Sequence, residues 1–68
     1  MNITLNGKIV FLDKKMMVDE LLEVTKAQTP EYVTVQINNE FIDKADFGIT
    51  PINEGDTVEY LYFMGGGQ

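Results

Sequence analysis

The chain has 68 residues, of which 44% are hydrophobic, and its 5 basic and 11 acidic residues give a formal net charge of −6. A chain of this length forms one domain near the lower size limit for a stable core. The chain has no cysteine, so it forms neither a disulfide nor a thiolate metal site. It also lacks histidine, the commonest acid–base residue in catalysis.

The negative charge also limits the classes of partner. A phosphate backbone would be repelled, so we expect no binding to nucleic acid. A basic protein partner is the natural complement, and the alternative is that the charge only keeps the chain soluble. No apolar run approaches the ~20 residues of a membrane span. The first residues lack the pattern of a signal peptide, so we expect a cytoplasmic protein with no membrane association.

The first elements are predicted to form a hairpin. Residues 2–6 alternate between apolar and polar side chains, which is typical of a half-buried strand. Asn6 and Gly7 then give the strongest short hairpin signal, because both residue types tolerate positive φ. Residues 8–12 return as a second strand, with Val10 and Leu12 facing the core.

An amphipathic helix is predicted near residues 18–27. Apolar or small side chains recur at i, i+3, i+4 and i+7, on Val18, Leu21, Leu22 and Thr25. The start of this helix is poorly marked, because Met17 cannot cap it with a side-chain oxygen.

Two further strands and an irregular segment follow the helix. Residues 32–37 alternate again, and residues 40–42 are long enough only for an edge strand. Residues 43–50 are predicted to be irregular, with room for one helical turn. We expect four apolar side chains to anchor this part of the chain: Phe41, Ile42, Phe47 and Ile49.

The last strand is predicted at residues 57–63, after a tight turn at Gly55 and Asp56. It is the most apolar strand and should therefore be central. Residues 1–64 then form the domain, and residues 65–68 form a flexible glycine-rich tail. Alternatively, this tail is only a frayed chain end.

The element order predicts an α+β fold. A helix that crosses between two strands favours a parallel arrangement of those strands, and one helix economically covers one face of a sheet. The order describes the β-grasp or ubiquitin-like roll, with a mixed sheet of four to five strands and one main helix.

With these elements in place, the sequence resembles the ThiS family of ubiquitin-like sulfur carriers, within the ThiS/MoaD superfamily. The resemblance runs the length of the chain. It rests on Asn6-Gly7, Val18-x-x-Leu21-Leu22, Val35-x-Ile37-Asn38, Phe47, Gly55-Asp56-x-Val58 and Gly66-Gly67. MoaD-type carriers of the molybdopterin pathway share the fold and the diglycine, and remain an alternative.

The resemblance implies a protein cosubstrate rather than an enzyme. A ThiF-like adenylyltransferase would use ATP to activate the carboxylate of Gly67, and no cofactor would be bound by the carrier itself. A sulfur donor, such as a cysteine desulfurase relay, would then leave a thiocarboxylate for a ThiG-like thiazole synthase. Gly65 and Gly66 would supply reach and slenderness to the tail.

Two positions depart from the family pattern. Met17 stands at the helix start, where the family often has Thr or Ser. Gln68 follows Gly67, so a peptide bond occupies the place of the reactive carboxylate. Some carriers that the chain resembles are trimmed by a metallopeptidase, so an enzyme that removes Gln68 is a further expected partner. Alternatively, the extra residue is simply tolerated.

The final strand also suggests a surface for docking. If Val58, Tyr60 and Tyr62 face the helix, then Glu59, Leu61 and Phe63 lie on the open face with Met64 beside them. An exposed apolar patch next to a reactive tail would bind partner proteins. Alternatively, these side chains cover one another or pack on the irregular segment.

Other functional classes remain open. The chain could be a β-grasp interaction module with an inert tail, or a ubiquitin-like modifier that becomes attached to lysines. A stand-alone enzyme is disfavoured, because the carboxylates are scattered over predicted solvent faces and form no catalytic constellation.

Overall fold

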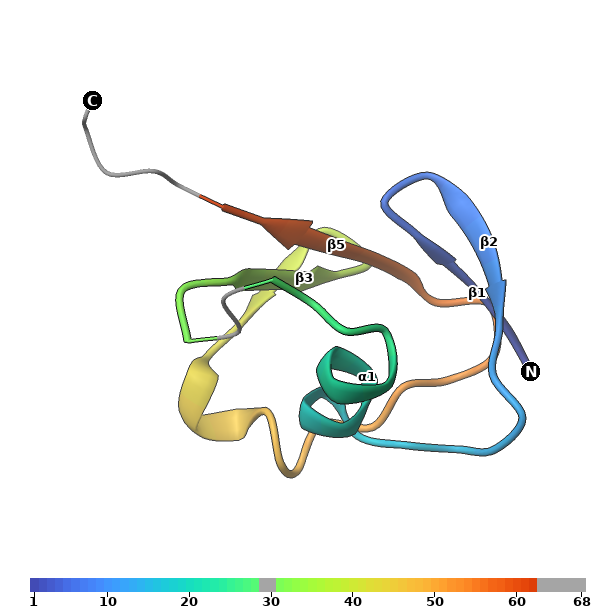
Figure 1. Ribbon diagram of the computed structural model, residues 1–68, viewed down its shortest axis with the longest axis horizontal. Coiled ribbons are helices and arrows are strands. Elements are labelled where there is room, and N and C mark those ends of the chain that lie inside the picture. The colour runs from blue at the N-terminus through green and yellow to red at the C-terminus, as the bar shows by residue number, and fades with distance from the viewer. Residues whose placement is uncertain (29–30, 63–68) are drawn as a thin grey trace.

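The computed structural model describes residues 1–28 and 31–62, which form one mixed five-stranded sheet and one α-helix (Figure 1). The elements in chain order are β1 (Asn2–Leu5), β2 (Lys8–Phe11), α1 (Val18–Val24), β3 (Thr34–Ile37), β4 (Glu40–Ile42), the 3-10 helix η1 (Lys44–Asp46) and β5 (Thr57–Leu61).

The strand order across the sheet is β2-β1-β5-β3-β4, so the predicted central position of the last strand is confirmed. β5 runs parallel to β1 and antiparallel to β3, while the two hairpins are antiparallel. The strands on either side of the helical crossover, β2 and β3, run in the same direction, as expected. They are not neighbours, because β1 and β5 lie between them.

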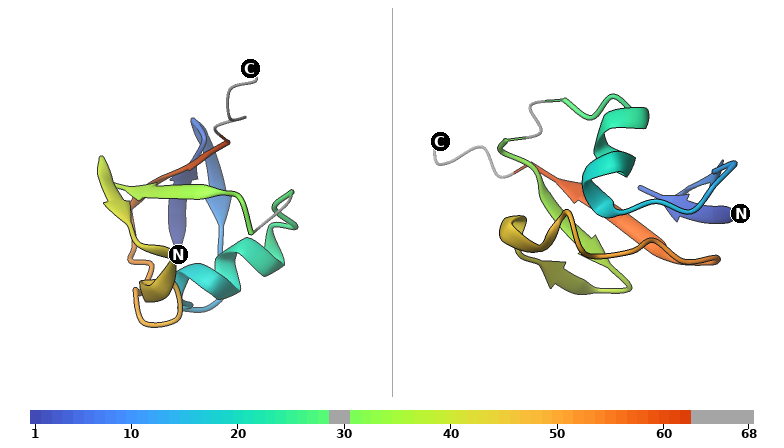
Figure 2. Two further views of the ribbon diagram at one scale, coloured as in Figure 1. Left: turned by 90° about the vertical axis from the view of Figure 1, so that its left-hand side faces the viewer. Right: turned by 90° about the horizontal axis from the view of Figure 1, so that it is seen from below.

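The helix covers one face of this sheet, and the segment after β4 lies on the same side, beside the start of α1 (Figure 2). Backbone hydrogen bonds join that segment to the helix start. Val18 N donates to Thr50 O at 3.0 Å, and Ile52 N donates to Met16 O at 2.9 Å. The architecture is therefore the expected α+β roll with a sheet layer and a helix layer.

Between the two layers lies an apolar core, most of whose side chains are aliphatic. The helix contributes the predicted stripe, in which Val18 and Leu21 are fully buried and Leu22 is 6% exposed. The other buried apolar residues are Ile3, Leu12, Met16, Val33, Val35, Ile37, Phe47, Ile52 and Val58. No helix in the described residues has the length and apolarity to cross a lipid bilayer.

The helix is shorter than its periodic pattern predicts. It ends at Val24, because Thr25 caps it by donating its hydroxyl to Leu21 O at 2.7 Å, and Lys26 adopts φ 54. Its start, which lacks an N-cap side chain, is stabilised from within. Glu20 reaches back and accepts a hydrogen bond from Met17 N at 3.0 Å, which is half of a capping box.

Two of the four apolar side chains that we expected to anchor residues 41–49 do not pack in the core, so the prediction is wrong for them. Phe41 is 63% exposed and Ile49 is 73% exposed, whereas Phe47 is buried and Ile42 packs against the core. Phe41 pairs with Gln36 in the β3–β4 ladder, between pairs that place Val35 and Ile37 in the core. Because side chains alternate across a strand, Phe41 must point to the opposite face of the sheet.

We expect Leu21→Ala to lower the free energy of unfolding by about 2–5 kcal/mol, because it leaves a cavity beneath the sheet. That is a large share of the stability of so small a domain. Val24→Ala, on the same helix but at a side chain 55% exposed, should change it by no more than about 0.5 kcal/mol. Urea unfolding followed by circular dichroism measures both, and equal losses would contradict this account of the core.

Candidate functional site

The candidate site begins where the central strand leaves the sheet. β5 runs toward the end of the molecule opposite the N-terminus (Figure 1). Most of the predicted site, Phe63, Met64, Gly65, Gly66 and Gly67 together with Gln68, lies outside the described residues. The structure therefore defines the platform from which this segment continues, namely β5 itself and its neighbours.

The side chains of β5 alternate between the helix and the open face of the sheet. Val58 is fully buried, and the Tyr60 hydroxyl lies 2.9 Å from the Thr25 hydroxyl at the end of α1. These two residues therefore face the helix. Alternation places Glu59 and Leu61 on the opposite, open face, and both are partly buried there.

Tyr60 anchors the end of β5 to the helix layer. Burial raises the pKa of its hydroxyl above the ordinary value of 10.0, although the hydrogen bond to Thr25 opposes this, and Tyr62 raises it further. The hydroxyl therefore remains protonated at neutral pH and holds its hydrogen bond. Its role in this arrangement is structural.

Asn6 fixes β5 from the side of β1. Its backbone N donates to Val58 O at 2.9 Å, and its side-chain Oδ1 accepts a hydrogen bond from Tyr60 N at 2.9 Å. The residue sits in the hairpin turn with φ 50, a conformation that asparagine tolerates well. Its side chain thus continues the parallel ladder past the point where β1 turns away.

The start of β5 is held by a second asparagine. Asn38 donates its backbone N to Thr57 O at 2.7 Å, and its Oδ1 accepts from Thr57 N at 2.9 Å. Its amide also donates to the carboxylate of Asp56 at 3.1 Å, and Asn53 N donates to the other oxygen of that carboxylate at 2.8 Å. Asp56 is only 8% exposed, and its hydrogen bonds account for its burial.

The open face beside β5 carries one apolar residue that the sequence pattern does not assign to it. Glu59 pairs with Gln36 of β3, and Gln36 pairs in turn with Phe41 of β4, so the three lie in one row across the sheet. Leu61 lies in the next row, opposite Thr34. Phe41 lies on the open face because side chains alternate along β4. The two residues that flank its partner Gln36 on β3, Val35 and Ile37, are buried on the opposite face.

The described residues include no group of three or more acidic side chains arranged to hold a metal ion. A cleft of about 450 Å³ lies beside β4 and η1, and another of about 440 Å³ lies between β2 and α1. Neither is lined by Glu59 or Leu61, so the candidate site is a strand end and an open sheet face rather than a pocket.

Comparison with known proteins adds to this geometry. The sequence profile of the ThiS family matches residues 2–67, and thus ends at Gly67. A crystal structure of the thiamine biosynthesis protein ThiS from Geobacter metallireducens is 46% identical, covering 97% of this chain and 99% of that one, with a TM-score of 0.92. A solution structure of a thiamine biosynthesis protein from the same organism is also 46% identical, with coverages of 100% and 90% and a TM-score of 0.79. A search of curated proteins found no match.

We expect Asn6→Gly to loosen the end of β5, because glycine keeps the positive φ but removes the acceptor of the Tyr60 amide. The loss should be about 1 kcal/mol, the value of an ordinary hydrogen bond. Asn6→Asp keeps an acceptor oxygen and serves as the matched control. Amide hydrogen exchange reports the effect directly: faster exchange at Tyr60 in the glycine variant alone is expected, and unchanged protection there would contradict the assignment.

Proposed function

Because the chain belongs to the ThiS family, we propose that it is a sulfur carrier of thiamine biosynthesis whose reactive group is the C-terminal carboxylate of Gly67 after removal of Gln68. The observation that carries the proposal is the position of β5. This strand lies in the middle of the sheet, and the glycine-rich segment begins four residues after its end. The crystallised ThiS relative is a thiamine biosynthesis protein, and this similarity favours that pathway over molybdopterin synthesis.

The proposed chemistry has two steps. A carboxylate oxygen of Gly67 attacks the α-phosphorus of ATP, pyrophosphate leaves, and an acyl-adenylate forms. Sulfide then attacks the acyl carbon and AMP leaves, which gives the thiocarboxylate directly. If the sulfur arrives as a persulfide, the attack gives an acyl disulfide, and a thiol must reduce its S–S bond, which releases the thiocarboxylate and leaves the donor sulfur in a new disulfide. The adenylate is needed because a free carboxylate has no good leaving group, and activation splits one difficult substitution into two easier ones.

In this proposal the partners supply the catalysis and the carrier supplies a positioned acyl group. A ThiF-like adenylyltransferase would bind ATP, a cysteine desulfurase relay would deliver sulfur, and a ThiG-like thiazole synthase would take it. All three partners would act on the carrier in the cytoplasm. Three consecutive glycines have no side chains to obstruct a narrow active-site channel, and they allow close approach of neighbouring atoms.

The open face beside β5 is the surface that we propose to dock onto the activating enzyme. Glu59 and Leu61 lie on this face, and Phe63 and Met64 follow shortly after them in the sequence. A few well-packed, desolvated side chains near the centre of an interface contribute most of its binding energy. A surface at the base of the tail would also fix the direction from which the tail enters the active site.

We expect Leu61→Asp to raise the KM of the carrier in adenylation by about tenfold or more, because it places a charge in a desolvated contact. Thr57→Asp is the matched control, since Thr57 lies on the same strand and the same face but four residues earlier. Pyrophosphate release by the purified adenylyltransferase measures both variants, and their amide spectra check that the fold is kept. A similar KM for the two variants would rule out docking through Leu61.

Gln68 supplies the test of the reactive group. An amide oxygen is a far poorer nucleophile than a carboxylate, so a chain in which Gln68 still follows Gly67 cannot form the Gly67 adenylate. Activation of Gln68 instead would displace the reacting atoms, and a displacement of about 1 Å can already cost ~10²-fold in rate. We therefore expect the chain with Gln68 to be a precursor and a chain ending at Gly67 to be the substrate.

Both forms should be incubated with the same adenylyltransferase, ATP and sulfide, with no peptidase present. Intact mass spectrometry should show a gain of ~16 Da only for the chain that ends at Gly67, as one oxygen becomes sulfur. Equal conversion of both forms would mean that the last residue is tolerated. If neither form is converted, the sulfur-carrier proposal itself fails, and an interaction module becomes the better interpretation.

A further inference from the structure

The edge strand β2 has features that the sulfur-carrier role does not use. β2 pairs with β1 on one side only, and it is the last strand of the sheet on that side. Two of its four residues, Ile9 and Phe11, are 78% and 71% exposed, which makes them two of the most exposed large apolar side chains in the described residues. A strand at the edge of a sheet presents unpaired N–H and C=O groups that can pair with another chain.

The register shows which backbone groups of β2 are available. Leu12 N donates to Met1 O at 2.7 Å, and Met1 N donates to Leu12 O at 2.6 Å, so these two residues form a hydrogen-bonded pair. Such pairs alternate along an antiparallel ladder. Val10 therefore bonds inward to β1, and the N–H and C=O groups of Ile9 and Phe11 point outward, away from the sheet.

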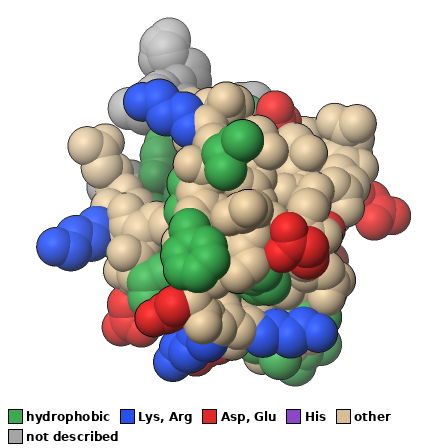
Figure 3. Space-filling model, turned by 90° about the vertical axis from the view of Figure 1, so that its right-hand side faces the viewer, with side chains coloured by type: hydrophobic (Ala, Val, Ile, Leu, Met, Phe, Trp, Pro, Cys, Tyr) green, Lys and Arg blue, Asp and Glu red, His purple; other side chains and the backbone are tan. Residues whose placement is uncertain are grey.

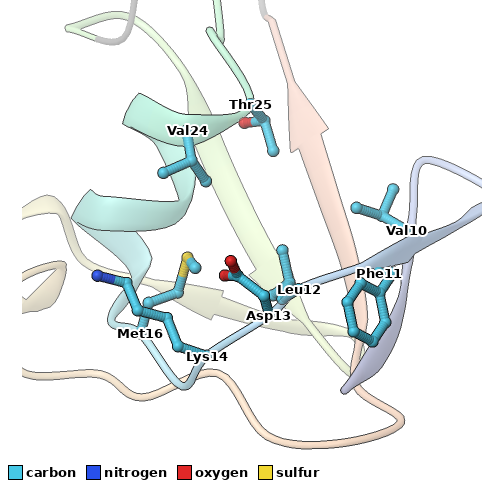
Figure 4. Close-up of a pocket in the computed structure, with 8 residues that line it drawn as sticks. All are labelled: Val10, Phe11, Leu12, Asp13, Lys14, Met16, Val24 and Thr25. Atoms are coloured by element: carbon cyan, nitrogen blue, oxygen red, sulfur yellow. The ribbon is translucent and has the colours of Figure 1, made fainter.

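A strand added to this edge would lie over a cleft. The cleft separates β2 from α1, has a volume of about 440 Å³, and is lined mainly by apolar side chains (Figure 4). Leu12, Met16 and Val24 face its open space. A new strand would run about 4.8 Å from β2, with every second side chain on the helix side of the sheet and hence in the cleft.

The charge of this edge differs from that of the rest of the chain. Residues 8–15 contain three of the five lysines and one of the eleven carboxylates, so the segment carries +2 while the remainder carries −8. This side of the molecule carries lysine and hydrophobic side chains together with several acidic ones (Figure 3). Residues 40–46, which contain the opposite edge strand β4, have three acidic residues and one lysine and so carry −2.

We propose that the β2 edge and the β2–α1 cleft bind an extended segment of a partner protein, with apolar residues at alternate positions and acidic residues at its ends. The outward backbone groups of Ile9 and Phe11 supply the ladder, the cleft takes the apolar side chains, and the lysines of residues 8–15 pair with the acidic ends. This is recognition by strand addition, in which backbone bonds give affinity and alternate pockets give specificity.

A second copy of this chain is a poorer occupant. Pairing of two β2 edges would bring one +2 segment against another, and like charges placed opposite each other are destabilising. A basic segment would be repelled in the same way. The acidic and apolar segment is the occupant that satisfies the backbone, the cleft and the lysines together.

The probe for a direct test is the end-blocked peptide Asp-Ile-Thr-Val-Thr-Ile-Asp-Glu, titrated into the ¹⁵N-labelled full chain to about 1 mM. We expect saturable downfield shifts of the Ile9 and Phe11 amide protons, with smaller shifts at Lys14 and Val24. The amides of Leu61 and of β4 should not move. A peptide with proline in place of the central valine cannot complete the ladder, and one with lysines in place of its acidic residues lacks the complementary charge; both should bind at least tenfold more weakly.

Two protein variants separate the backbone and charge contributions. Ile9→Pro removes one outward N–H while leaving the bonds to β1, and should weaken binding at least tenfold. Lys14→Glu should weaken it about fivefold, whereas Lys44→Glu, an equal change of charge on η1, should not. The charge variants keep the test valid if the proline variant does not fold.

Three results would overturn the proposal. The first is the absence of shifts at Ile9 and Phe11 up to the highest peptide concentration. The second is a binding site elsewhere, with shifts centred on Leu61 or on β4. The third is concentration-dependent shifts of β2 without peptide, which would assign the edge to a second copy of the chain. None of these results depends on sulfur transfer, so they leave the proposed function untouched.

Discussion

The structure depends on the way in which a short central strand is held from both sides. The parallel pairing of β5 with β1 consists of only two residue pairs, Thr4 with Thr57 and Leu5 with Val58. Two asparagine side chains extend this pairing, since Asn6 binds the Tyr60 amide and Asn38 binds the Thr57 amide. Together with the ladder to β3, these contacts fix the direction in which the chain leaves the domain, which is the property that a carrier with a C-terminal reactive group requires.

Much of this fold could be predicted, because alternation and helical periodicity report directly on burial. The stripe of Val18, Leu21 and Leu22 and the inward set of β3 lie where the patterns place them. The end of the helix could not be predicted in the same way. The helix ends where the Thr25 hydroxyl binds a backbone carbonyl and Lys26 adopts a positive φ. Both features come from local hydrogen bonding, and the hydrophobic pattern does not report on them.

The side chains that fix the site are also beyond sequence reasoning. The Asn-Gly pattern correctly places Asn6 in a turn, but its contact with Tyr60 spans 54 residues and has no local signal. The position of Phe41 is missed because a three-residue strand is too short to show which of its faces is buried. The orientation of Leu61, in contrast, follows from alternation once Val58 is known to face the helix.

The two surfaces inferred for this domain lie on different parts of the sheet, and this separation has a physical consequence. β1 stands between β2 and β5, so a strand added at the β2 edge leaves the open face beside Leu61 uncovered. A partner that holds the carrier through β2 would keep the C-terminal segment near its active site, and the second contact would become intramolecular. Effective concentrations for such tethered encounters reach the millimolar range. A weak surface at the end of β5 would then be sufficient for activation, and it would also allow the loaded carrier to leave for the next enzyme.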